Sequence, residues 1–253
     1  MVIRSAGASI VQKTAPRYIP PMKPVLIIQN HEIENAGTII DYLSERQMLF
    51  EIAHTWRGDP MPDGRDHLAS IVMGCPTSVN EIPNHEFLKH LYAFVSRAVR
   101  NSHPYLGICF GGQILARVMG AKVERNPHKE IGTFPHRLTP EGRSDPLFRG
   151  FPSEFMAFHW HSDTFRIPFG ATNLVESDKC KNQAFRVGKA VGLQFHFEAD
   201  LNKLPVWCEV YASELTELGL AATAISSEFK THADEIRRLN YLLLDNFFAL
   251  ASE

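Results

Sequence analysis

Short apolar runs alternate with amphipathic segments through the first half of this chain, and this alternation restricts the fold more than any other feature. The runs at 25–30 (VLIIQN) and 67–74 (HLASIVMG) are nearly continuous, which is typical of strands buried on both faces. A further strand is expected at 50–55, while segments 35–47 and 84–99 place apolar residues at helical spacing. The pattern predicts parallel βαβ units in a three-layer α/β sandwich with a mostly parallel open sheet.

The rest of the chain continues without an internal repeat or a linker. Residues 122–198 contain several short β-like runs, and the last 50 residues have a helical pattern. We therefore expect residues 24–253 to form a single domain with a helical C-terminal segment. Residues 1–23 are rich in proline and small residues and lack periodicity, so we expect a flexible extension there, with a weak transit peptide as the alternative.

The charge balance and the cysteines argue against several classes of protein. There are 26 basic and 28 acidic side chains, so neither nucleic acid nor a membrane surface is expected as a partner. No apolar run approaches the roughly 18 residues that span a bilayer. The four cysteines include no close-set pair of the kind that binds zinc, which favours the free thiols of a cytoplasmic protein over disulfides.

The sequence GICFG at 107–111 lies between a β-like run and a helical segment. Ligands of open α/β sheets bind where strands end and helices begin. A tight strand-to-helix turn flanked by glycines keeps its central side chain accessible, and a helix N-terminus favours the thiolate form of a cysteine. Cys109 is therefore a candidate nucleophile. The alternative is a buried structural cysteine, the more frequent fate of a free thiol.

A candidate base occurs in GLQFHFEAD at 192–200. On a strand, His196 and Glu198 would point to the same face, where the carboxylate would fix the imidazole tautomer and support its charged form. A cysteine nucleophile needs such a base, and the base needs an orienting group. Taken alone, the motif is better explained by an incidental pair on a half-exposed strand.

Together, LGICFGGQ and LQFHFE resemble the nucleophile and His-x-Glu motifs of class I glutamine amidotransferases, most closely those standalone proteins that are similar to the amidotransferase domain of GMP synthase. The resemblance covers about residues 24–198, because further segments fit in order: PVLIIQN, GDPMP, IVMGCPTSV, NPHKEIG, FHWHSDTF and NQAFRV. An ordered series is much more specific than one motif. The resemblance implies a flavodoxin-like fold, glutamine amidotransferase activity and no cofactor.

The resemblance also implies the roles of individual residues. Cys109 would attack the side-chain amide carbon of glutamine, His196 would act as base and acid, and Glu198 would orient His196. Backbone N–H groups of Phe110 and Cys75 would stabilise the oxyanion.

Two positions depart from the family pattern. The family usually has Gly-Gly-Pro at the oxyanion turn, where this chain has GCP at 74–76, and the loss of glycine restricts how that turn can flip. Phe197 replaces the usual proline between the histidine and the glutamate, and we expect little effect because the spacing is kept.

Substrate binding is implied for four residues. Gln113 matches the family position that contacts the amino-acid end of the substrate. The segment HWHSD matches a strand end whose backbone meets the substrate carboxylate, which implicates Ser162 and Asp163, with His161 close by.

Two other interpretations of nearby residues stay open. His159, His161 and Asp163 alternate onto one strand face and so offer a metal site as an alternative, although the family needs no metal. Glu130 and Gly132 would line the entrance of the pocket or form a plain turn.

The sequence lacks the ATP-binding loop with which a complete GMP synthase would use ammonia, as well as a G-x-x-x-x-G-K-[ST] motif. Two enzymatic functions remain. The chain would be a glutaminase that supplies a separate synthetase subunit, or a standalone γ-glutamyl hydrolase or peptidase that uses the same thioester chemistry. The substrate is accordingly glutamine or another γ-glutamyl compound. A catalytically idle binding protein is a third possibility, against which the intact Cys109, His196 and Glu198 argue.

Overall fold

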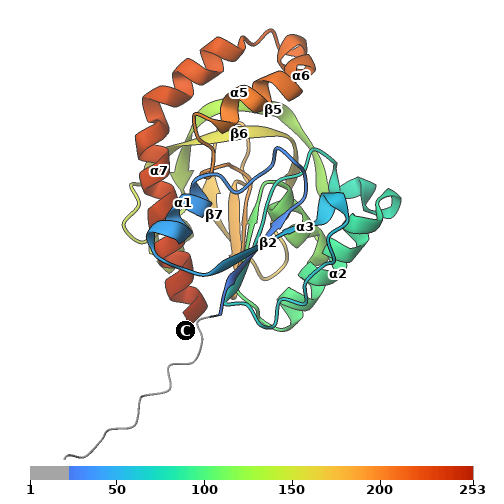
Figure 1. Ribbon diagram of the computed structural model, residues 1–253. Helices are drawn as coiled ribbons and strands as arrows, with labels where there is room; N and C mark the ends of the chain where they lie inside the picture. The colour runs from blue at the N-terminus through green and yellow to red at the C-terminus, as the bar shows by residue number, and fades with distance from the viewer. Residues whose placement is uncertain (1–22, 253) are drawn as a thin grey trace, which may run out of the picture.

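The computed structural model describes residues 23–252, whose strands form one open nine-stranded sheet (Figure 1). The strand order across the sheet is β2-β1-β3-β4-β9-β8-β7-β5-β6. The strands are β1 (Val25–Gln29), β2 (Phe50–His54), β3 (Ala69–Val72), β4 (Tyr105–Ile108), β5 (Val123–Leu138), β6 (Glu154–Phe165), β7 (Thr172–Glu176), β8 (Ala184–Val187) and β9 (Ala190–Leu193). The extension expected at residues 1–23 lies outside the described residues, apart from residue 23.

Helices cover both faces of the sheet, which confirms the predicted three-layer α/β sandwich (Figure 1). One apolar core lies between the sheet and the helices α1 and α7, and a second lies between the sheet and the helices α2 and α3. The helices are α1 (Thr38–Glu45), α2 (Glu86–Arg100), α3 (Phe110–Val118), α4 (Pro140–Ser144), α5 (Lys203–Val210), α6 (Ala212–Glu217) and α7 (Ala222–Ser252).

The sheet has a parallel half and an antiparallel half. Strands β2, β1, β3, β4 and β9 pair in parallel, and the helices that connect them lie over the two faces, as the alternating pattern predicts. The remaining pairings are antiparallel and involve the β-like runs of the middle third. The long β5–β6 pair changes register between Arg125 and Glu130, which is a local irregularity of the kind often found beside active sites.

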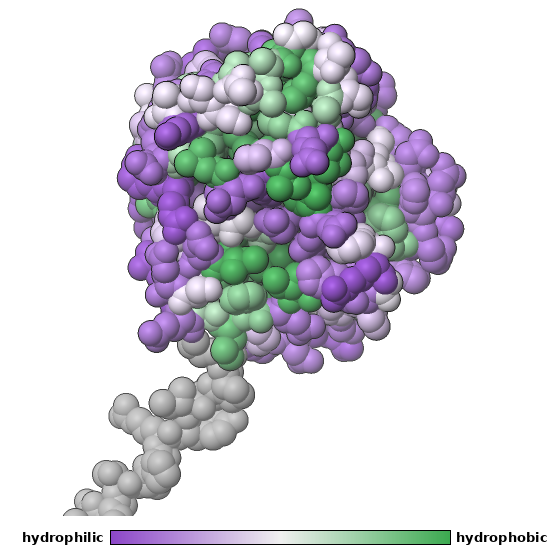
Figure 2. Space-filling model, turned by 45° about the horizontal axis from the view of Figure 1, so that its top comes forward, coloured by the Kyte–Doolittle hydropathy of each residue, from purple (hydrophilic) through white to green (hydrophobic). Residues whose placement is uncertain are grey.

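The C-terminal helices predicted from the sequence are present, and α5 and α6 lie beside the middle of β5 and β6 (Figure 1). Four apolar side chains of this region are between 38% and 52% exposed, and they belong to Val206, Val210, Leu218 and Leu220. Figure 2 shows apolar and polar surface interleaved on the face that includes the top of the molecule. Within the described chain, none of the helices combines the length and the apolar character needed to cross a membrane.

Candidate active site

Cys109 occupies a sharp turn between β4 and α3. Strand β4 ends at Ile108, α3 begins at Phe110, and Cys109 between them has φ 50° and ψ −104°. A positive φ is unusual for a residue with a Cβ, so the surrounding packing must hold this conformation. Glycine is required on both sides because a Cβ at Gly107 would overlap the Gly111 carbonyl, and one at Gly111 would overlap a carbonyl of β3. The flanking glycines thus make the turn possible.

Replacing Gly111 by alanine should therefore destabilise the protein by at least about 3 kcal/mol, since the added methyl group meets rigid backbone. Gly58→Ala is the matched control, because Gly58 has φ 92° but no atom within 4 Å of an added Cβ. It should cost only about 1–2 kcal/mol, the strain of a left-handed alanine. Urea unfolding of the two variants measures both values, and equal losses would contradict the packing argument.

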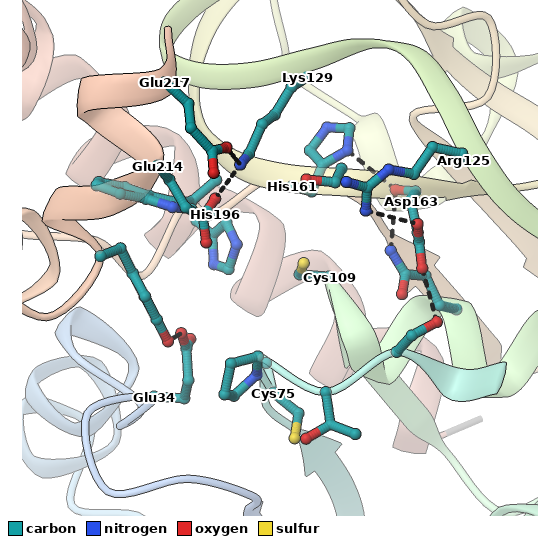
Figure 3. A pocket seen from close by; sticks show the side chains of 18 residues that line it. Glu34, Cys75, Cys109, Arg125, Lys129, His161, Asp163, His196, Glu214 and Glu217 are labelled. Atoms are coloured by element: carbon teal, nitrogen blue, oxygen red, sulfur yellow. Dashed lines mark hydrogen bonds and ion pairs between the residues drawn. The ribbon is translucent and has the colours of Figure 1, made fainter. Parts of the chain in front are cut away.

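Cys109 and His196 open into the same cavity, whose volume is about 340 Å³ (Figure 3). The cavity lies at the C-terminal ends of β3 and β4, where open α/β sheets bind their ligands. Its lining combines the turn at 74–78, the start of α3, the middle of β6 and side chains from α6. These residues are Glu34, Gly74, Cys75, Pro76, Thr77, Ser78, Cys109, Gln113, Arg125, Lys129, Trp160, His161, Ser162, Asp163, His196, Tyr211, Glu214 and Glu217.

His196 is held by a buried carboxylate. Its Nδ1 donates to Glu198 Oε1 at 2.8 Å, and Lys203 Nζ donates to the same oxygen at 3.2 Å. Its other nitrogen, Nε2, has no hydrogen-bond partner among residues 23–252. The hydrogen bond of Nδ1 thus fixes the orientation of the His196 ring, which borders the cavity, and leaves Nε2 available to exchange a proton.

The electrostatics of this pair favour a charged imidazole. Burial alone would lower the pKa of His196, but the Glu198 carboxylate and the Cys109 sulfur raise it well above its usual range. Burial would raise the pKa of Glu198, and the Lys203 ammonium and His196 outweigh it and lower the pKa to about 2. Glu198 is fully buried, so its charge persists because of these two partners.

The prediction that His196 and Glu198 lie on a strand was wrong. Strand β9 ends at Leu193, and the pair follows in an irregular segment, anchored where the His196 N–H donates to the Phe158 carbonyl at 2.8 Å. The i, i+2 spacing still brings the two side chains together. The strand prediction failed because the apolar pattern of the sequence continues beyond Leu193, the last residue of β9 that pairs with a neighbouring strand.

The two segments expected to supply oxyanion donors both reach the site. Phe110 is the first residue of α3, where backbone N–H groups lack partners within the helix. Cys75 lines the cavity, and among the described residues the only non-glycine residues with positive φ are Gln47, Ser102 and Cys109. Cys75 therefore adopts its turn without a left-handed backbone in this state.

The four residues expected to bind substrate all line the cavity. Gln113 Nε2 donates to the Asp163 carbonyl at 3.0 Å, and His161 Nδ1 lies 3.0 Å from the same oxygen. The segment HWHSD does not end a strand, however, because β6 continues to Phe165. Ser162 and Asp163 instead lie across from the register change in β5.

Two expectations for the surroundings are corrected. Asp163 does not join the two histidines, because its carboxylate accepts from Ser78 Oγ at 2.7 Å; the group whose ligand atoms lie within 4.8 Å of one another is Glu130, His159 and His161. Glu130 does not line the entrance but is fully buried behind His161, and Gly132 is not among the lining residues either.

Several residues in or beside the cavity were not predicted from the sequence. Gln194 Nε2 lies 3.5 Å from Cys109 Sγ, and its position two residues before His196 is the only signal that would have indicated it. Lys129 pairs with Glu214 at 2.6 Å and with Glu217 at 3.8 Å, which ties β5 to α6 at the rim (Figure 3). Helical periodicity gives no indication that α6 reaches the cavity.

Comparison with known proteins identifies the family. The model of glutamine amidotransferase class-I matches residues 30–204, more than half of the chain. The glutamine amidotransferase-like protein YfeJ of Salmonella typhimurium is 28% identical over 86% of this chain and 90% of its own length. GMP synthase of Thermosipho africanus is 39% identical, but only over 38% of this chain and 18% of that enzyme.

Solved structures agree with this comparison. A glutamine amidotransferase from Thermotoga maritima superimposes with a TM-score of 0.83 at 31% identity, covering 89% of this chain and 97% of the other. A glutamine amidotransferase from Methylobacillus flagellatus gives a TM-score of 0.83 at 29% identity, covering 90% and 95%. This chain belongs to the class I glutamine amidotransferase family.

Proposed function

We propose that the protein hydrolyses the side-chain amide of glutamine through a Cys109 thioester and releases ammonia. The strongest support is that Cys109, on a strained turn, shares one cavity with an imidazole whose far side is held by a buried carboxylate. Nucleophile, base and orienting group are the three parts that covalent acyl transfer requires. In this proposal they are Cys109, His196 and Glu198.

The reaction proceeds in two halves. His196 takes the thiol proton of Cys109 as the sulfur bonds to the amide carbon, and the carbonyl oxygen becomes an oxyanion that accepts hydrogen bonds from the backbone N–H groups of Phe110 and Cys75. His196 gives its proton to the departing nitrogen, the C–N bond breaks and ammonia leaves. Water then attacks the thioester while His196 takes one of its protons, the C–S bond breaks and glutamate is released. Gln113, His161, Ser162 and Asp163 would hold the amino-acid end of the substrate.

The destination of the ammonia is a separate question. GMP synthase is more than five times longer than the stretch that it shares with this chain. By analogy with that enzyme, a separate synthetase subunit would use the ammonia that this chain releases. We place the enzyme with soluble cytoplasmic glutaminases on the basis of its free cysteines.

A second candidate function is hydrolysis of larger γ-glutamyl amides. On the side of His196 the cavity is lined by Lys129 and by the acidic side chains Glu214 and Glu217 of α6 (Figure 3). Trp160 and Tyr211 also line the cavity. His196 would protonate the leaving group, so this side of the cavity is where a group larger than ammonia would lie. The rim therefore has polar partners for a peptide-like leaving group.

A substrate panel separates the two functions. We expect purified full-length protein to release ammonia from glutamine, with kcat/KM for γ-glutamyl dipeptides no more than about a hundredfold higher, which corresponds to about 2.7 kcal/mol of transition-state preference. A larger preference for dipeptides would replace the glutaminase assignment by γ-glutamyl hydrolysis. If the wild-type protein were as inactive as the Cys109→Ala variant on both glutamine and γ-glutamyl dipeptides, the proposed function would be contradicted.

A further inference from the structure

Three side chains that line the cavity each hold a buried polar atom without a hydrogen-bond partner within residues 23–252. These atoms are His196 Nε2, Trp160 Nε1 and Glu34 Oε2. The proposed reaction uses the imidazole nitrogen, and the indole N–H of Trp160 can only donate. Glu34 Oε2 is therefore a hydrogen-bond acceptor that the proposed reaction leaves unused. A buried acceptor without a donor is costly, so we expect a ligand to supply the donor.

The protein holds Glu34 in a fixed position. Glu34 lies in the loop that follows β1, and its side chain is only 6% exposed. The indole N–H of Trp207 donates to the carbonyl of the preceding residue at 3.1 Å, and the Lys203 ammonium donates to the carbonyl of the following residue at 2.6 Å. The Tyr211 hydroxyl donates to Glu34 Oε1 at 3.1 Å. Backbone and side chain are thus both anchored, and Oε2 is the part of Glu34 that is left for a ligand.

This free oxygen lies beside the ring of His196. A Cβ added to Gly74 would be 2.6 Å from Glu34 Oε2 and 3.6 Å from His196 Cε1, which is the ring carbon bonded to Nε2. Both groups therefore approach the same point of the turn at 74–76, and the missing side chain of Gly74 leaves room for the carboxyl group. Figure 3 shows Glu34 on the same side of Cys109 as His196, whereas Asp163 lies on the opposite side.

The leaving nitrogen of the substrate would lie on the side of Glu34 and His196. In the proposed reaction His196 gives its proton to that nitrogen, which must therefore come within hydrogen-bond distance of His196 Nε2. The amino-acid end of the substrate would lie on the opposite side, with Gln113 and Asp163. The N–H groups of the leaving nitrogen lose their water when the substrate enters the cavity, so they need an acceptor from the protein. Glu34 Oε2 is the unpartnered acceptor on this side.

We infer that Glu34 is a specificity-determining residue, whose Oε2 accepts a hydrogen bond from an N–H of the leaving nitrogen. The inference rests on the proposed function and defines its substrate class: γ-glutamyl amides whose nitrogen keeps at least one hydrogen, such as glutamine and γ-glutamyl peptides. Esters and dialkylamides of the γ-carboxyl group offer no such N–H and would leave Oε2 unpaired. The same contact orients the amide, because an amide oxygen turned toward Oε2 would be repelled.

Two substrates that share the glutamyl part test the inference in the full-length enzyme. Glutamine has N–H groups on its leaving nitrogen, whereas the γ-methyl ester of glutamate has a leaving oxygen without hydrogen. Glu34→Leu should lower kcat/KM for glutamine about 10–100-fold, the effect of losing a hydrogen bond to a carboxylate, and should change kcat/KM for the ester less than about threefold. Equal losses on both substrates would show a merely structural role. Equal losses, or no loss on glutamine, would overturn the inference.

Glu32→Leu is the matched control for this variant. Glu32 lies in the same loop, but its side chain is exposed and does not line the cavity. The control should therefore hydrolyse both substrates at the wild-type rate. A loss of glutamine hydrolysis in Glu32→Leu as large as that in Glu34→Leu would assign the effect to the loop and overturn the inference.

A binding measurement separates this inference from the proposed function, because it needs no turnover. In the Cys109→Ala background, Glu34→Leu should raise the Kd of glutamine about tenfold in calorimetry and leave the Kd of the γ-methyl ester unchanged. An equal change for both ligands would overturn the inference. If the wild type hydrolysed neither substrate but this preference for glutamine depended on Glu34, the proposed function alone would be contradicted. If glutamine did not bind at all, both would be overturned.

Discussion

Cys109→Ala should lower kcat/KM for glutamine by at least about a thousandfold, the scale seen when the nucleophile of a triad is removed. The expected loss is large because no other thiol lies on a strand-to-helix turn that opens into the cavity beside His196 in the described structure. The fold should be unaffected, since alanine keeps the Cβ and removes only the sulfur. Thermal unfolding and an ammonia-release assay on the same preparation check both expectations.

The other cysteines provide matched controls. Burial raises the pKa of Cys75 to about 11 and also raises those of Cys180 and Cys208, so these thiols are poor nucleophiles at neutral pH. A glutamine analogue with an alkylating group should therefore label Cys109 alone in mass spectrometry. Cys208→Ala should retain activity within about threefold. Full activity in Cys109→Ala, or labelling at Cys75, would show that the proposed nucleophile is wrong.

The parts of the site that could be predicted are those encoded in a few consecutive residues. The turn at Cys109 needs glycine at positions 107 and 111. Because the backbone is so tight there, the requirement can be recognised in the sequence. The contact between His196 and Glu198 follows from their spacing, even though the strand assignment was wrong. The three-layer fold was predictable because apolar periodicity reports directly which faces are buried.

The parts that could not be predicted depend on side chains from distant segments. Lys203, which stabilises the Glu198 charge, comes from α5, and no motif relates the two residues. Glu130 was expected at the entrance or in a plain turn, but it resumes the β5–β6 pairing after the register change, directly opposite His161, and so lies inside. A register change of this kind cannot be recognised from the periodicity of the sequence. It nevertheless determines which polar side chains become buried next to one another.

Glu198→Gln should lower kcat/KM by about a hundredfold to ten-thousandfold, because the amide keeps the shape of the side chain but not its charge. The direction in which the pH profile of kcat/KM should shift follows from the pKa of His196. Its pKa is raised in the wild type, so the imidazolium that we propose as the proton donor to the leaving nitrogen persists into alkaline solution. Without the carboxylate, only the Cys109 sulfur still opposes the effect of burial, and the pKa of His196 falls. The alkaline limb of the kcat/KM profile should therefore move toward lower pH by about 1–3 units.

A loss of activity in Glu198→Gln has a structural alternative, because the variant leaves Lys203 buried without its carboxylate partner, a defect that costs about 3–5 kcal/mol. The double variant Glu198→Gln with Lys203→Met removes both buried charges and should recover most of the lost stability in urea unfolding. It should not recover activity, and its alkaline limb should stay at the lower pH, because His196 still lacks the carboxylate that raises its pKa. If activity returned together with stability, Glu198 would serve the fold and not the chemistry, and the orienting role assigned to it would be wrong.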